Sequence, residues 1–118
     1  MNLQRGDVAL ALYPFASGAG HSRCPVVVIQ SDAYNKRIRN TIVAQITTNL
    51  TRTSDPAHLL IDISSPDGKQ SGLLHNSVVS CLNLVTLTED RLEKVIGRLP
   101  NTLILQMNAC LKAALGIP

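Results

Sequence analysis

The chain has 118 residues, enough for one domain with a single modest core, and we expect residues 1–118 to fold as one unit. Hydrophobic residues make up 45% of the chain, Trp is absent and the net charge is +3, which predicts an aliphatic core but identifies no partner class by itself. No apolar run approaches the ~20 residues of a membrane span, no secretory leader opens the chain, and three scattered cysteines form no disulfide framework, so we expect a cytoplasmic protein.

Short strands are predicted to fill the first half of the chain. The clearest covers residues 25–31, where Val26 to Ile29 is a β-branched stretch too short for a helix. A Gly-containing loop at 15–24 and a polar, basic connection at 32–40 separate it from its neighbours. The predicted strands are residues 8–14, 25–31, 41–48 and 58–63.

The second half changes from strand spacing to helix spacing. Residues 66–69 are typical of a turn, and one or two further strands are expected within 73–84. Acidic residues follow a candidate N-cap at Thr88, and the apolar spacing from there predicts a helix over 88–96. A last helix is predicted from 101 or 102 to 115, with an apolar stripe along it. These elements describe an α+β domain dominated by strands, with C-terminal helices.

Five segments stand out by their order and spacing. They are Arg5-Gly6-Asp7-Val8, Arg23-Cys24-Pro25-Val26-Val27-Val28-Ile29-Gln30-Ser31-Asp32, Thr41-Ile42-Val43-Ala44-Gln45-Ile46-Thr47-Thr48, Pro56-Ala57-His58-Leu59 and Gly72-Leu73-Leu74-His75-Asn76-Ser77-Val78-Val79. Together they resemble the MazF/PemK family, the toxin halves of bacterial type II toxin–antitoxin pairs. The resemblance covers nearly the whole chain.

The resemblance implies a small SH3-like β-barrel that pairs as a homodimer. It also implies a sequence-specific endoribonuclease, or mRNA interferase, which cleaves single-stranded mRNA and is neutralised by a cognate antitoxin. Such cleavage needs no metal or cofactor, because the adjacent 2′-hydroxyl attacks the phosphorus and leaves a 2′,3′-cyclic phosphate and a 5′-hydroxyl. The reaction needs a base, an acid and a positive charge for the transition state, although a site that lacks one proton-transfer group can still work slowly.

The family's arginine, in an Arg-Pro pair at the end of the first loop, supplies that charge. Here the pair is interrupted, since a gapless match places Cys24 in the arginine position and Arg23 one residue earlier. A one-residue shift on a strand turns a side chain to the opposite face, so we expect a bulge to restore the orientation of Arg23. Arg23 is our candidate phosphate-binding residue, the alternative being an exposed loop charge. Cys24 is expected to be a small buried residue.

The family's threonine at the end of the third strand is matched by Thr47, and Thr48 follows it. The implied role of Thr47 is a hydrogen bond to the scissile phosphate or the 2′-hydroxyl, with Thr48 also contacting RNA; the alternative is that Thr47 is a β-former at a strand end. Some relatives use an Arg and an Asp on a later strand. The corresponding residues here are Ser80 and Leu82, which can do neither job, and this argues against an acid–base pair of that kind.

Three histidines remain as candidates. His21 lies in the first loop, two residues before Arg23, and is our candidate substitute proton carrier, although a lone loop histidine is often a bystander. His58 matches a family position that is usually structural. His75 is expected near the dimer groove as an RNA contact. We expect no metal site, because the histidines are scattered and no Cys or carboxylate stands beside them at ligand spacing.

A basic cluster in the second connection is the candidate RNA-binding surface. Lys36, Arg37 and Arg39 fall within four residues, beside amides that could contact phosphates and base edges. The alternative is a solvated connection between two strands.

Two functions follow from these patterns. The first is the metal-independent endoribonuclease toxin. The second is an RNA-binding domain on the same barrel that is catalytically weak or has lost cleavage, which the missing arginine and carboxylate would permit. A gyrase poison related to CcdB is disfavoured, since the chain has no Trp for the C-terminal signature of that group.

Overall fold

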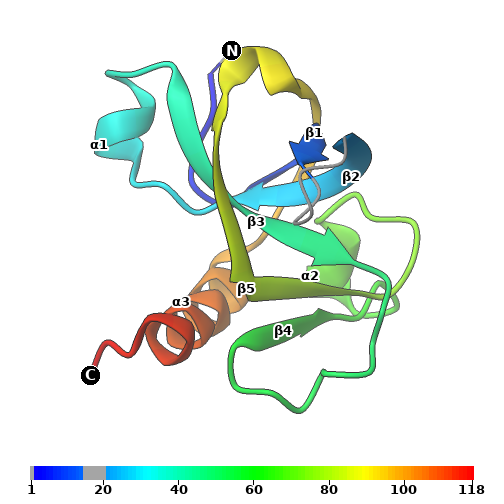
Figure 1. The fold of residues 1–118 in the computed structure, drawn as a ribbon. Coiled ribbons are helices and arrows are strands. Elements are labelled where there is room, and N and C mark those ends of the chain that lie inside the picture. The colour runs from blue at the N-terminus through cyan, green and yellow to red at the C-terminus, as the bar shows by residue number, and fades with distance from the viewer. Residues whose placement is uncertain (1, 15–20) are drawn as a thin grey trace.

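A curled antiparallel sheet forms the body of the protein (Figure 1). The computed structural model describes residues 2–14 and 21–118, and within them six strands pair in the order β4-β5-β3-β2-β1-β6. The strands are β1 (Asp7–Pro14), β2 (His21–Val28), β3 (Asn40–Thr47), β4 (His58–Ile61), β5 (Ser77–Thr88) and β6 (Leu92–Arg98). Among these described strands β4 and β6 are the two edges, so the sheet curls like a barrel without being closed by strand pairing. The predicted β-dominated, SH3-like fold is thus confirmed.

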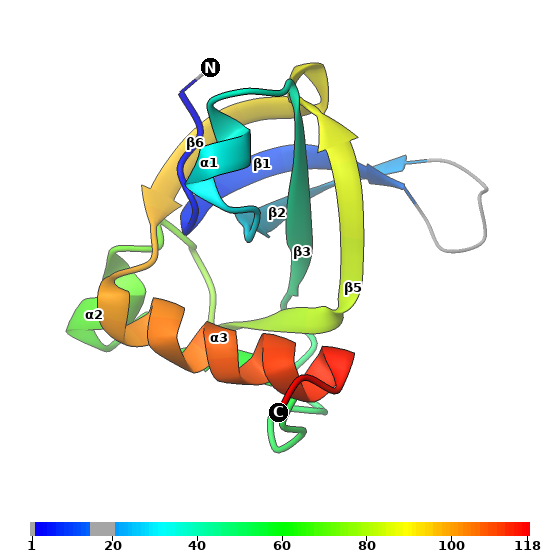
Figure 2. The same cartoon turned by 90° about the vertical axis from the view of Figure 1, so that its left-hand side faces the viewer.

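One long helix lies across one end of the sheet (Figure 2). This helix, α3 (Asn101–Leu115), packs against β4 and β5. It matches the predicted last helix, with Leu103, Met107 and Cys110 buried. Three short helical turns lie in connections: α1 (Asp32–Asn35), α2 (Pro66–Lys69) and the 3₁₀ turn η1 (Glu89–Arg91). No helix in the described residues is long and apolar enough to cross a membrane.

Strand β5 bends sharply and so belongs to both halves of the sheet (Figure 1). Its partner residues jump from Leu84 opposite Ala44 to Ser80 opposite Gln45. Residues 81–83 are therefore extra on β5, a bulge that turns the strand and is a frequent device beside functional sites. The N-terminal part of β5 then pairs with β4, from His58↔Ser80 to Ile61↔Ser77.

Alternation along the strands divides the core into two clusters. Val27 packs in the cluster beneath α3, together with Ile46, Ile61 and Met107. Its neighbours Val26 and Val28 point the other way, into a second cluster. Both are built almost entirely from aliphatic side chains, as the composition predicted.

The predicted helix over 88–96 is wrong, so there is one C-terminal helix rather than two. The segment forms η1 and then β6, whose residues pair with β1 through Leu10↔Lys94 and Ala9↔Val95. Pairing with β1 satisfies the backbone of this segment and covers the edge of that strand, and this outweighs the local helical spacing. Residues 66–69, predicted as a turn, form the one-turn helix α2.

Cys81 makes stability sensitive to alkaline pH. Burial, and secondarily the neighbouring Cys110, raise the pKa of the Cys81 thiol from 9.0 to about 12. The folded state therefore favours the protonated thiol, and this contribution is complete below pH 9 and lost as pH rises toward 12. We expect the difference in unfolding free energy between wild type and Cys81→Ala to shrink from pH 8 to 11 in urea titrations with reductant. A pH-independent difference would contradict this.

Candidate functional site

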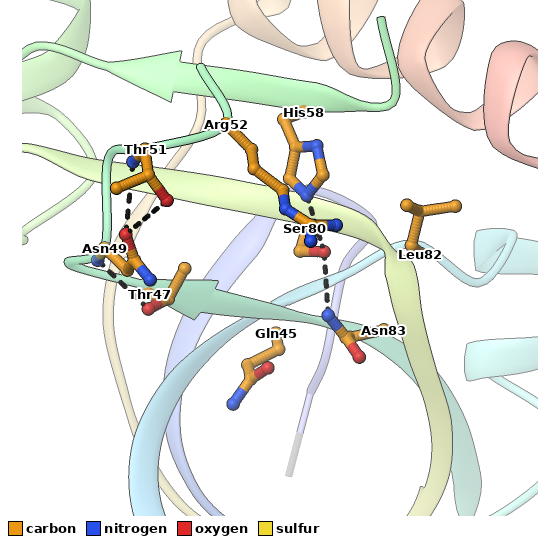
Figure 3. Close-up of a pocket in the computed structure, with 9 residues that line it drawn as sticks. All are labelled: Gln45, Thr47, Asn49, Thr51, Arg52, His58, Ser80, Leu82 and Asn83. Atoms are coloured by element: carbon orange, nitrogen blue, oxygen red, sulfur yellow. Dashed lines mark hydrogen bonds between the residues drawn. The ribbon is translucent and has the colours of Figure 1, made fainter. Parts of the chain in front are cut away.

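A polar cavity of about 450 Å³ opens where β3 ends, β4 begins and β5 bends (Figure 3). Amides, hydroxyls, an imidazole and a guanidinium line it, and none of its described lining residues is a carboxylate. The lining residues are Gln45, Thr47, Asn49, Thr51, Arg52, His58, Ser80, Leu82 and Asn83. Such a group of donors, with one permanent positive charge, suits a polyanionic ligand.

Hydrogen-bonded turns after β3 place Thr47 and Arg52 at the same cavity. The Asn49 backbone N–H donates to Thr47 Oγ1 at 3.1 Å. Thr51 donates to Asn49 Oδ1 from its backbone N–H at 3.1 Å and its hydroxyl at 2.8 Å. Since Thr47 Oγ1 accepts a hydrogen bond here, its own hydroxyl proton remains available for a ligand. Figure 3 shows the Arg52 side chain extending from this connection toward His58 and Ser80.

A hydrogen-bonded chain of side chains forms the wall opposite. His58 Nε2 lies 3.1 Å from Ser80 Oγ, and Asn83 Nδ2 donates to the same oxygen at 2.9 Å. Because Ser80 accepts from Asn83, its hydroxyl proton can point to His58 Nε2, which places the imidazole proton on Nδ1. The His58 side chain is only 7% exposed, and its Nδ1 lies 3.6 Å from Asp55 Oδ2. Nδ1 has no hydrogen-bond partner among the described residues.

The bulge in β5 is held in place on both sides. The Tyr13 hydroxyl donates to the Asn83 carbonyl at 2.9 Å, and the Cys81 N–H donates to the Ala57 carbonyl at 3.0 Å. These bonds fix the backbone that carries Ser80 and Asn83, so the cavity wall is preorganised.

The structure separates Arg23 from this cavity. The β1–β2 register runs without a shift past Leu12↔Arg23, so the expected bulge is not formed. Arg23 Nε instead lies 2.7 Å from Glu93 Oε1, and the arginine side chain is 64% exposed. A catalytic role for Arg23 stays a prediction.

Cys24 lies beside the cavity in the position where the family has its arginine. Burial raises the pKa of the Cys24 thiol, and a side-chain hydrogen bond with Gln45, a residue of the cavity lining, lowers it in part. The position that would carry the charge therefore carries a neutral thiol near neutral pH.

Most other predicted RNA contacts lie elsewhere. Lys36, Arg37 and Arg39 are exposed before the first residue of β3, whereas Thr47 is its last (Figure 1). At ~3.3 Å per residue, a strand of this length spans roughly 25 Å. Arg39 Nε lies 3.9 Å from Glu89 Oε2. Their role in binding RNA stays a prediction.

Thr48 and His75 come together in a second cavity of about 410 Å³, which is mainly apolar and also lined by Pro25 and Leu73. This places the two predicted RNA contacts side by side without testing their role. His21 opens β2 opposite Pro14, but its side chain lies outside the described residues.

Sequence reasoning missed Arg52, Gln45 and Asn83, and it treated His58 as structural. The available signal for Arg52 was a lone arginine in the polar stretch five residues after Thr47. Nothing in the sequence indicates that a bulge in β5 brings Asn83 back to Ser80.

Comparisons with known proteins place the chain in a family. The family model for PemK-like, MazF-like toxins of type II toxin–antitoxin systems matches residues 4–115. The chain is 31% identical to Endoribonuclease MazF of Staphylococcus epidermidis, over 98% of this chain and 92% of that protein. It is 30% identical to Endoribonuclease EndoA of Bacillus subtilis, over 99% and 97%.

A solved structure shares the fold. An endoribonuclease in complex with its cognate antitoxin from Mycobacterial species has a TM-score of 0.78 and 23% identity, covering 98% of this chain and 97% of that one. From the family match and the sequence relatives together, the chain belongs to the PemK-like, MazF-like toxins of type II toxin–antitoxin systems.

Proposed function

We propose that this toxin is a metal-independent endoribonuclease that cleaves single-stranded RNA in the cavity beside Thr47. The observation that carries the proposal is that the threonine matched to the family lies in a cavity rich in hydrogen-bond donors. The relatives from Staphylococcus epidermidis and Bacillus subtilis are named as endoribonucleases.

The reaction is attack of a 2′-hydroxyl on the adjacent phosphorus. It forms a 2′,3′-cyclic phosphate and releases a 5′-hydroxyl, so no external nucleophile is consumed. The surroundings must take and give a proton and hold negative charge on the phosphoryl oxygens. The hydroxyl of Thr47 and the guanidinium of Arg52 are donors of the kind that this charge requires.

Recognition of a short RNA sequence would rest on amides. The side chains of Gln45, Asn49 and Asn83 line the cavity with amide donors, and Gln45 and Asn83 also offer amide oxygens as acceptors. Such groups suit the edges of unstacked bases in single-stranded RNA. No Phe, Tyr or Trp side chain is among the described lining residues, so base stacking on such rings would not contribute there.

The proposal extends to partners and location. Residues 1–118 would act as one domain that pairs as a homodimer in the cytoplasm, and a cognate antitoxin would neutralise the toxin. A MazE–MazF complex from Deinococcus radiodurans has this fold, with a TM-score of 0.74 and 16% identity over the whole of both chains.

A second candidate function is RNA binding without cleavage. The substitutions favour it: a thiol stands at Cys24 in place of the family's arginine, and Ser80 and Leu82 stand where some relatives carry an arginine and an aspartate. Such a protein would bind RNA in the same cavity but would not cleave it.

A cleavage assay separates the two. Purified protein is incubated with a long single-stranded RNA in EDTA, and the new ends are mapped and their phosphates identified. We expect cuts at one short motif, with 2′,3′-cyclic phosphate ends, and no cut where a single 2′-deoxynucleotide replaces the attacking ribose. Binding without cuts would support the second function, and cuts that need a divalent cation would contradict the mechanism.

A further inference from the structure

We propose that Arg52 binds the scissile phosphate and that His58 accepts the 2′-hydroxyl proton through Ser80. This assignment rests on the ribonuclease proposed above and names the groups that perform its chemistry in this chain. It places both functions on residues for which the sequence analysis predicted no catalytic role.

Arg52 brings a positive charge to the cavity. Among the described residues that line the cavity, it carries the only permanent positive charge. The other candidate arginine, Arg23, is engaged by Glu93 at 2.7 Å. The Arg52 guanidinium makes no hydrogen bond or ion pair with another described residue, so its donors are available for two phosphoryl oxygens at once.

The geometry of the connection supports the same role. Arg52 is exposed at the mouth of the cavity, and Thr47 lies in the same lining. The Asp55 N–H donates to the Arg52 carbonyl at 3.0 Å, so the backbone there is ordered while the side chain stays free. A phosphate in the cavity could then contact the guanidinium and the Thr47 hydroxyl together.

His58 lies between the carboxylate of Asp55 and the hydroxyl of Ser80. The imidazole is nearly buried, yet it lines a polar cavity and has an unpaired Nδ1 facing Asp55 at 3.6 Å. The ring thus has a carboxylate near one nitrogen and a hydroxyl within hydrogen-bond distance of the other. A carboxylate behind the ring stabilises the imidazolium that forms when Nε2 takes a proton.

Ser80 offers a route for that proton. Asn83 occupies one lone pair of Ser80 Oγ at 2.9 Å, and His58 Nε2 lies 3.1 Å from the same oxygen. Ser80 can therefore receive a proton from the cavity while passing its own to His58. Asp55 itself is fixed by the Ala57 N–H, which donates to its Oδ1 at 2.9 Å.

The step balances without a co-reactant. The 2′-hydroxyl proton moves to Ser80 Oγ as the Ser80 proton moves to His58 Nε2, and the 2′-oxygen forms its bond to phosphorus. The bond from phosphorus to the 5′-oxygen breaks, and that oxygen takes a proton from water. The imidazolium then returns its proton to the hydroxide left in the solvent. The products are the cyclic phosphate and a 5′-hydroxyl.

The first test concerns Arg52. Single-turnover cleavage of a short RNA in EDTA is compared for wild type, Arg52→Ala, Arg52→Lys and Arg23→Ala, with Lys112→Ala on the exposed side of α3 as the control. We expect Arg52→Ala to lose about 10²–10³-fold, Arg52→Lys to recover part of the rate, and the control to change less than about fivefold. Thermal unfolding confirms that each variant is folded.

The second test concerns His58. His58→Gln, which can keep a hydrogen bond to Ser80, is expected to lose about 10²–10⁴-fold, and His21→Gln is assayed beside it. His58→Ala is then assayed at fixed pH with imidazole and with substituted imidazoles of different basicity. We expect these to restore cleavage, and the restored rate to rise with basicity. A merely structural role would give rescue that depends on size alone.

The outcomes separate this assignment from the function on which it rests. If wild type does not cut the RNA, the ribonuclease and the assignment both fail. If wild type cuts but Arg52→Ala and His58→Gln keep its rate, the ribonuclease stands and the assignment is wrong. If Arg23→Ala or His21→Gln loses cleavage instead, the catalytic residues are those predicted from the sequence in the first loop, and the assignment to Arg52 and His58 is wrong.

Discussion

Replacing Thr47 by Val is expected to lower the single-turnover rate of RNA cleavage by about 10²–10³-fold. Thr47 Oγ1 accepts a hydrogen bond from the Asn49 N–H at 3.1 Å, which leaves its hydroxyl proton available to a ligand. Valine keeps the shape and the β-propensity of the residue but has no hydroxyl to place on the phosphate or the 2′-oxygen. The measurement is the cleavage rate at saturating enzyme, together with RNA affinity.

Thr47→Ser provides the matched control. It keeps the hydroxyl that accepts from Asn49 and donates to the ligand, so its rate should stay within about fivefold of wild type. An equal loss in the Ser and Val variants would show that the methyl group matters rather than the hydroxyl. A wild-type rate in Thr47→Val would remove Thr47 from the reaction.

Replacing Gly72 by Ala is expected to lower the unfolding free energy by more than about 3 kcal/mol, or to prevent folding. Gly72 has a φ of +75°, and an added Cβ would lie 2.0 Å from the Ile96 carbonyl oxygen of β6. This contact is with backbone and cannot be relieved by a rotamer change. Gly72 lies where the segment after α2 packs against β6. A hydrogen bond from the Arg98 N–H to the Gln70 carbonyl, at 2.9 Å, joins the two segments.

Gly116→Ala is the matched control, because it has the conformational cost of a positive φ without the steric clash expected in Gly72→Ala. Gly116 ends α3 with a φ of +69°, and an added Cβ there would meet nothing within 4 Å. We expect it to cost about 1 kcal/mol, the conformational penalty alone. Chemical denaturation of both variants measures the difference. Equal costs would mean that the segment before β5 moves freely from β6, contrary to the packing described.

The second half of the sheet shows where local patterns fail. Both 88–96 and 101–115 have helical apolar spacing, but only the second segment forms a helix. Residues 101–115 can bury their stripe against β4 and β5 while making their own backbone bonds. Residues 92–98 instead lie along the free edge of β1. Whether a segment becomes a strand depends on a partner whose position the local sequence does not encode.

The sequence by itself determined what depends on neighbours along the chain. The β-branched run at Val26–Ile29 and the stripe of α3 each follow from residue spacing, and the ordered motifs point to the toxin family and to Thr47. Tertiary structure decided which side chains meet. The β1–β2 register continues without a bulge at Arg23, so that residue does not line the cavity. The bulge at 81–83 brings Ser80 and Asn83 to His58. Arg52 reaches the same cavity through turns, because long-range pairing sets the positions of side chains that are distant in sequence.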